Sequence, residues 1–178
     1  MTAIIGLLLF VLVYLPLGRL GQRIASPIRI VDRFESFQEG DVIWYSPLPE
    51  AQSGDFVVYR MPDQSFNQGN TVYRLGGDSI GRVLATEGQT VSADGANVAV
   101  DNHPLDWTTA HMVTRLKGAP IKVPQGRIFV YADVATFGRM TRQQFLQISI
   151  VSPSSIRGSV LFRSFPIGRI SRMNPRAI

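Results

Sequence analysis

The stretch Asp55-Phe-Val-Val-Tyr59, which follows the turn residues Ser53-Gly54, decides the fold class. Its β-branched and aromatic residues favour a strand, and the glycine before them favours a tight turn. The same combination recurs at 41–45 and 71–75, and short apolar runs follow at 82–85, 97–100, 127–131 and 159–162. Many short strands between glycine and proline turns predict a mostly β domain with a folded antiparallel sheet.

Turn residues separate these runs. The expected turns are Glu39-Gly40, Ser53-Gly54, Gly76-Gly77, Asp94-Gly95 and Pro124-Gln-Gly126. The run Gly76-Gly-Asp-Ser79 lacks the Gly-Lys-Ser/Thr ending of a phosphate loop, so it predicts a hairpin turn only. We expect a single short helix, at residues 140–148.

Residues 3–17 carry no charge, and this apolar character extends around Arg19. About 20 such residues cross a bilayer as a helix, and a slightly shorter run suffices if Arg19 reaches the interface. We expect an uncleaved anchor rather than a signal peptide, because no positive charge precedes the run and no small-x-small site follows it. The predicted organisation is an anchor at 1–22, a connector at 23–38, a β domain at 39–166 and a basic tail at 167–178.

Composition excludes several classes of site. The chain has no cysteine, which excludes disulfides and thiolate sites, and only His103 and His111 could supply imidazole. We therefore expect no metal and no cofactor. The net charge is +5, and no basic block with interleaved aromatic residues occurs, so we expect a lipid bilayer and acidic protein surfaces as partners rather than nucleic acid.

Several phrases occur in a characteristic order along the chain. They are Glu39-Gly-Asp-Val-Ile43, Ser53-Gly-Asp-Phe-Val-Val58 with Arg60-Met-Pro62, Arg82-Val-Leu-Ala-Thr-Glu-Gly88 with Gln89-Thr-Val91, Asp94-Gly95 with 98–105, Val123-Pro-Gln-Gly126 with 128–133, and 151–160. As an ordered set they resemble type I signal peptidases, the membrane-bound serine proteases with a serine–lysine dyad. The resemblance implies that family's folded antiparallel β domain and one N-terminal transmembrane helix.

The resemblance also implies positions for the dyad. The family's serine stands eight residues before the first Gly-Asp glycine, where this chain has Asp32, and its lysine stands directly before Arg82, where this chain has Gly81. Ser36 matches the nucleophile only if four residues were deleted. Of the box that supports the lysine, Asp133 alone remains, and a turn-capping role suits it better.

These departures predict a catalytically inactive member of the family, kept as a membrane-anchored scaffold or accessory subunit of a larger membrane complex, respiratory or photosynthetic for example. The site that once held a peptide would then hold an extended segment of a partner. The alternative is a divergent active serine peptidase in which Ser36 is paired with Lys117 or Lys122. A Ser-His-Asp set built on His103 or His111 is a weaker alternative.

Contacts with the membrane or a partner are expected from arginines and aromatic residues, which dominate interface energies. The candidates are Arg19, Arg23, Arg29, Phe34, Phe37, Trp44, Arg169, Arg172 and Arg176. We expect a single-pass protein of the inner (cytoplasmic) membrane. The arginines after the anchor favour a cytoplasmic domain, whereas the resemblance implies an extracytoplasmic one, which we prefer.

Overall fold

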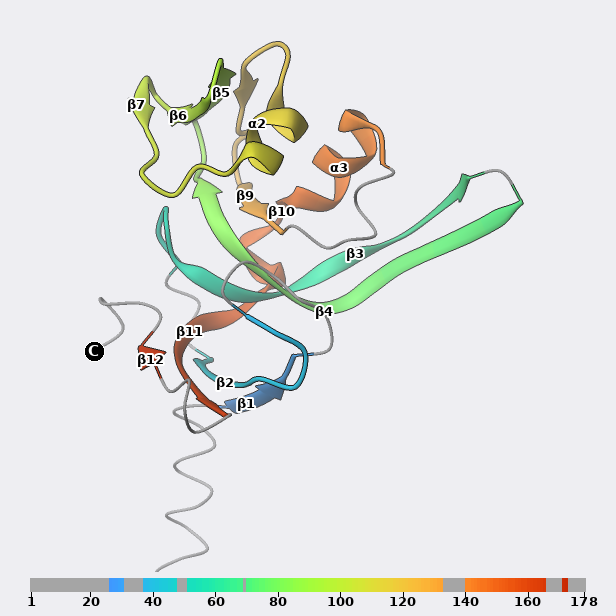
Figure 1. Cartoon of the computed structure of the whole chain (residues 1–178), viewed down its shortest axis with the longest axis vertical. Helices are drawn as coiled ribbons and strands as arrows, with labels where there is room; N and C mark the ends of the chain where they lie inside the picture. Colours follow the sequence, from blue (N-terminus) through green and yellow to red (C-terminus); the bar gives the residue numbers. More distant parts are fainter. Residues whose placement is uncertain are drawn as a thin grey trace, which may run out of the picture.

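The computed structural model describes residues 26–30, 37–47, 51–68, 70–132, 140–165 and 171–172. In these residues the chain forms two antiparallel sheets and two short helices (Figure 1). The prediction of a mostly β, antiparallel domain is confirmed. No helix in this part of the chain is long and apolar enough to cross a bilayer. The expected anchor at 1–22 lies outside the described residues.

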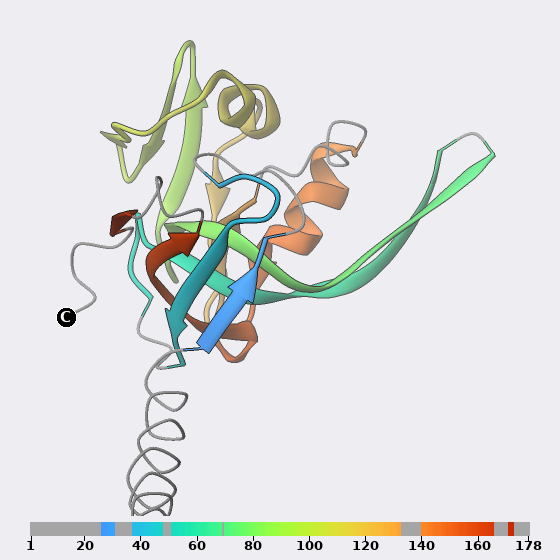
Figure 2. The same ribbon diagram turned by 60° about the horizontal axis from the view of Figure 1, so that its bottom comes forward.

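The large sheet contains eight of the described strands. Its order is β1 (Ser26–Arg29), β2 (Val42–Ser46), β11 (Ile156–Phe165), β3 (Phe56–Gln68), β4 (Thr71–Ala85), β9 (Ile128–Tyr131) and β10 (Ile150–Val151), with β12 (Ser171–Arg172) paired to β11. The last long strand thus lies between β2 and β3, and Figure 2 shows β1, β2 and β11 side by side. Strands distant in sequence are therefore joined in one sheet around a shared core.

The small sheet forms one end of the domain. Its order is β7 (His103–Pro104), β6 (Asn97–Val100), β5 (Thr90–Asp94) and β8 (Ile121–Lys122). Helix α2 (Ala110–Leu116) packs on β5 and β6, whereas helix α3 (Arg142–Ser149) packs on β3, β9 and β10. The Phe145 ring of α3 lies 6.3 Å from that of Phe129 and 5.8 Å from that of Tyr131, so aromatic packing holds this helix to the large sheet.

Both helices begin at a threonine cap. The expected helix at 140–148 is found as α3, where Thr141 and Gln144 form a capping box. Helix α2 was not predicted, because its seven residues, about two turns, give little apolar periodicity. Its cap, in which the Thr109 hydroxyl accepts a hydrogen bond from the Met112 amide, is the local feature that could have indicated it.

One turn geometry recurs at the ends of strands. In Gln38-Glu-Gly-Asp41 the Asp41 amide donates to the Gln38 carbonyl at 3.1 Å, and the Gln38 amide donates to an Asp41 carboxylate oxygen at 2.9 Å. The turn Gln52-Ser-Gly-Asp55 repeats both bonds at 3.0 Å, and the third residue in each is a glycine with positive φ. The Gly-Asp pairs of the sequence are therefore side-chain-closed turns that set where the following strands begin.

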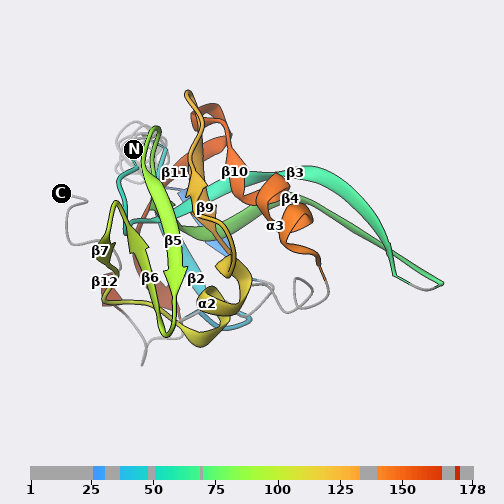
Figure 3. The same ribbon diagram turned by 90° about the horizontal axis from the view of Figure 1, so that it is seen from above.

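The expected turn at Gly76-Gly77 is wrong. Both glycines lie inside β4, and the last pair of the hairpin is Gln68 with Thr71 instead. Gly76 lies against Asp63 at the bulge of β3, where a Cβ would overlap the Asp63 carboxylate. Residues 64–68 and 71–75 form a two-stranded extension, here called the arm, which projects from the rest of the described fold in Figures 1 and 3.

Candidate functional site

The region of interest begins at the residue that follows Ser36. Phe37 is fully buried, and its ring meets that of Phe56 edge to face at 5.3 Å. Phe56 in turn lies under the Arg82 guanidinium, which is 4.9 Å from the Phe56 ring centroid and 4.0 Å from that of Trp107. This stack ties the chain after Ser36 to β3, to β4 and to the loop before α2.

Phe37 was predicted as a membrane or partner contact. The structure places it in the core instead, because the aromatic stack encloses its ring. Sequence reasoning also missed the stack itself. The Arg82 Nε–H donates to the Gly54 carbonyl at 2.8 Å, so the arginine that follows position 81 fastens the second Gly-Asp turn to β4. A single arginine within a strand, such as Arg82 in β4, carries no local pattern that would reveal its contact with the turn.

A buried ion pair supports the first Gly-Asp turn. Arg163 of β11 lies with its Nη1 3.4 Å from an Asp41 carboxylate oxygen, and both residues are buried. Removing one partner of such a pair leaves a buried charge without compensation, which is strongly unfavourable. The loop that leads out of Ser36 is therefore fixed at its far end by a contact from the opposite end of the chain.

Gly81 occupies the position that the family resemblance assigns to lysine. It lies in the middle of β4, opposite Val57 of β3, and is buried. A Cβ built there would overlap Val130 Cγ1 and would lie 2.9 Å from the Tyr131 carbonyl oxygen and 3.2 Å from Tyr59 Cε1. Because β4 pairs with β3 at Gly81 and with β9 from the next residue on, the backbone has little freedom to move away. Side chains of neighbouring strands fill the volume that a residue 81 side chain would need.

Tyr59 lies beside position 81, and its hydroxyl is the group there that could be considered as a base. The residue is fully buried. Burial of its hydroxyl raises the pKa of Tyr59 well above its usual value. Tyr59 therefore stays a neutral phenol at physiological pH. It cannot accept the proton of a serine hydroxyl under these conditions.

Every amine and imidazole side chain of the chain lies in residues 103–122. His103 is in β7, His111 is in α2, Lys117 caps the C-terminus of α2, and Lys122 is in β8. All four are exposed. Figure 1 shows α2 and the small sheet at the top, whereas residues 37–41, in cyan, lie in the lower half beyond β3 and β4. The structure thus does not bring the two lysines to the segment that follows Ser36.

Two of the expected contact residues lie on the described surface. Arg29 of β1 is exposed. Trp44 of β2 is half-buried; its Nε1–H donates to the Ser164 hydroxyl at 2.9 Å, and its ring stacks on Phe162 at 6.0 Å. Phe162 is 39% exposed, so this aromatic pair opens to solvent at the β2–β11 face. A role of this pair in contact with a membrane or partner stays a prediction.

Most of the other candidates cannot be placed. Only the backbone of Arg172 is described. It lies in β12 and pairs with Phe162 of β11. The remaining candidates that lie outside the described residues are Arg19, Arg23, Asp32, Phe34, Ser36, Asp133, Arg169 and Arg176. No group of three or more metal-binding side chains occurs within the described part of the chain.

Comparisons with known proteins agree with the resemblance. A sequence model of the family described as "Signal peptidase, peptidase S26" matches residues 3–163. A protein of Synechocystis sp. (strain ATCC 27184 / PCC 6803 / Kazusa) named "Probable signal peptidase I-1" is 31% identical over 118 residues. The alignment covers 66% of this chain and 57% of that relative, so the chain spans less than two thirds of the relative's length.

These findings correct one prediction. The chain was expected not to be an enzyme, but the matched family and the similar protein both carry the name of an enzyme. The expectation of a pseudo-peptidase is therefore wrong. The exchanges at Asp32 and Gly81 do not by themselves show that catalysis is lost, because a serine remains nearby at position 36.

Proposed function

Because the chain belongs to the signal peptidase family, we propose that it is a membrane-associated serine endopeptidase that removes signal peptides from exported proteins. The observation that carries this proposal is the family match over residues 3–163, which includes the apolar N-terminal run, Ser36 and both Gly-Asp turns. We place the protein in the inner membrane as a single-pass protein, with the β domain on the extracytoplasmic side, where the cleavage sites of exported proteins emerge.

Ser36 is the nucleophile in this proposal. It directly precedes Phe37, which the aromatic stack holds, and the Gln38–Asp41 turn and the Asp41–Arg163 pair secure the chain that follows. A nucleophile needs such fixed surroundings, because a displacement of about 1 Å can lower the rate about a hundredfold. The Ser36 hydroxyl oxygen attacks the scissile carbonyl carbon, the C–N bond breaks, and the new amine leaves with a proton. Water then hydrolyses the acyl-enzyme ester and frees the serine.

The proton acceptor in this mechanism is not the residue that the family pattern names. Gly81 has no side chain, Tyr59 stays protonated, and Lys117 and Lys122 lie on α2 and β8 away from the Phe37 segment. The pH dependence of kcat/KM identifies the acceptor's class. An acidic limb with a midpoint near about 4 indicates a carboxylate, and one near about 6.5 indicates an imidazole.

The proposal is tested with the full chain in detergent micelles and a preprotein that carries its signal peptide. We expect cleavage at one site, and a loss of about a thousandfold or more in Ser36→Ala. Ser92→Ala, in the small sheet, is the matched control and should cleave as the wild type does. Lys117→Ala and Lys122→Ala should also keep activity. Absence of cleavage by the wild type, or equal loss in the two serine variants, would contradict the proposal.

A further inference from the structure

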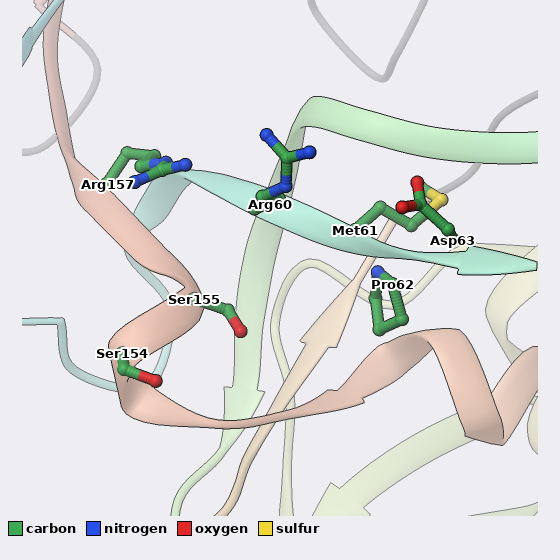
Figure 4. A pocket seen from close by; sticks show the side chains of 7 residues that line it. All are labelled: Arg60, Met61, Pro62, Asp63, Ser154, Ser155 and Arg157. Atoms are coloured by element: carbon green, nitrogen blue, oxygen red, sulfur yellow. The ribbon is translucent and has the colours of Figure 1, made fainter.

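A hollow of about 310 Å³ opens where β3 leaves the large sheet and continues into the arm (Figure 4). Strand β11 pairs with β3 only as far as Tyr59, opposite Ile156, and beyond that residue none of the described strands pairs with β3 on this side. One wall of the hollow is formed by residues 60–63 of β3. The other is formed by Ser154 and Ser155 of η2 (Pro153–Ser155) and by Arg157 of β11.

Two arginines, Arg60 and Arg157, line this hollow. The Arg157 Nε lies 3.5 Å from an Asp78 carboxylate oxygen, in a pair that is about half exposed on both sides. Arg60 is exposed, and no hydrogen bond or ion pair joins its guanidinium to another of the described residues. Figure 4 shows the Arg157 side chain extending over β3 toward Arg60. Two guanidinium groups therefore share this end of the hollow, and Asp78, which stands opposite Arg60 in the β3–β4 register, forms its ion pair with Arg157.

Among the described residues no ion pair joins the Asp63 carboxylate to Arg60 or Arg157. Its carboxylate folds back against Gly76 of the neighbouring strand, a placement that only a residue without Cβ permits there. Figure 4 shows Met61 between the Asp63 carboxylate and the Arg60 side chain. The bulge of β3 between Met61 and Gln64 produces this arrangement, because it turns Asp63 away from the register of its neighbours.

The rest of the lining is suited to one acidic side chain. Ser155 has a hydroxyl directed into the hollow in Figure 4, and Ser154 lies beside it. Guanidinium and hydroxyl donors together favour an oxyanion, and the planar guanidinium fork matches a carboxylate. Met61 is buried and Pro62 half-buried, so they offer an apolar floor for methylene groups. Free phosphate has no group that would use such a floor.

We propose that this hollow is a second, non-catalytic binding site that takes a glutamate side chain of an extended peptide segment. The Arg60 guanidinium and the Ser155 hydroxyl bind the carboxylate, while Met61 and Pro62 contact the methylene groups. Strand addition does not contribute here, because Pro62 has no N–H to pair and lies in the bulge. The site goes beyond the proposed peptidase activity and does not depend on it.

The test uses the full chain in micelles with the Ser36→Ala change, so that no peptide is cleaved. The probe is a fluorescent, acetylated and amidated hexapeptide of alanine and serine with one central glutamate, and binding is followed by anisotropy at low salt. We expect Arg60→Gln to weaken binding about tenfold or more, and Ser155→Ala about threefold. Glutamine in place of the peptide's glutamate should weaken it as strongly as Arg60→Gln.

Arg127→Gln is the matched control, because Arg127 is an exposed arginine outside the hollow. It should leave binding unchanged, and Arg60→Lys, which keeps the charge without the fork, should fall between wild type and Arg60→Gln. The proposal is overturned if no binding occurs at about millimolar peptide, or if Arg127→Gln weakens binding as much as Arg60→Gln. Binding of glycerol phosphate through Arg60 without binding of the peptide would instead assign the site to a lipid headgroup or free phosphate.

Discussion

Replacing Gly81 by alanine tests whether position 81 has room for any side chain. The new Cβ would overlap Val130 Cγ1 and would lie 2.9 Å from the Tyr131 carbonyl oxygen, which is part of a paired strand. Overpacking of a filled core costs up to about 3 kcal/mol. The reduced freedom of the unfolded chain offsets about 0.4–1 kcal/mol of this. We expect Gly81→Ala to lower the free energy of unfolding by about 2 kcal/mol.

A second substitution locates the cause. Val130→Ala removes the nearest atom and on its own should cost about 2 kcal/mol, as expected for a buried aliphatic side chain. In that background Gly81→Ala should cost only about 1 kcal/mol, because the Tyr131 carbonyl contact remains. The two changes should therefore be non-additive by about 1 kcal/mol. Gly54→Ala is the control: no atom lies within 4 Å of its Cβ, and its φ of +91° makes alanine unfavourable through the backbone alone.

The assay is thermal unfolding of the full chain in micelles, followed by circular dichroism. For a chain of this size about 1 kcal/mol corresponds to about 2–4 °C in Tm, so Gly81→Ala should lower Tm by about 4–8 °C. The decrease in Tm caused by Gly54→Ala should be the same with and without Val130→Ala. The reasoning is refuted if Gly81→Ala leaves Tm unchanged, or if its cost adds to that of Val130→Ala within about 0.5 kcal/mol.

Three further predictions concern pH, partners and topology. The pKa of Tyr59 is raised in the folded state, so above about pH 10 only the unfolded state loses this proton, and the free energy of unfolding should fall as pH rises further. Tyr59→Phe should reduce that fall in unfolding curves measured at alkaline pH. An unchanged slope would exclude Tyr59 as its source. If arginines near the anchor hold a partner subunit, changing Arg23 and Arg29 to glutamate should release the protein from a complex in mild detergent without lowering its Tm. Wild-type protein that already migrates alone would contradict a partner held by these arginines. Protease added to sealed inner-membrane vesicles of cytoplasmic-side-out orientation should leave the β domain intact, and its digestion would place the domain in the cytoplasm.

Local sequence patterns were sufficient for the strands that lie in the core. The run 55–59 predicted the first part of β3 because it is rich in β-branched and aromatic residues, and all four residues from Phe56 to Tyr59 are buried. The glycines before it and before β2 predicted the two Gly-Asp turns, since both adopt positive φ. The Gly76-Gly77 error arose because a glycine pair is equally compatible with a turn and with a strand that must accept the Asp63 carboxylate.

The sequence by itself determined the fold class, the Gly-Asp turns and the family, since these depend on residue order and local backbone preferences. Only the tertiary structure decided which side chains meet. It packed Val130 and Tyr59 into the space beside Gly81, buried Phe37 against Phe56, and placed the two lysines at the end of α2 and in β8 of the small sheet. It also left Arg60 without an ion pair to any other described residue at the root of the arm, where the bulge turns Asp63 toward Gly76. Such contacts join strands far apart in the chain, and no local preference specifies them.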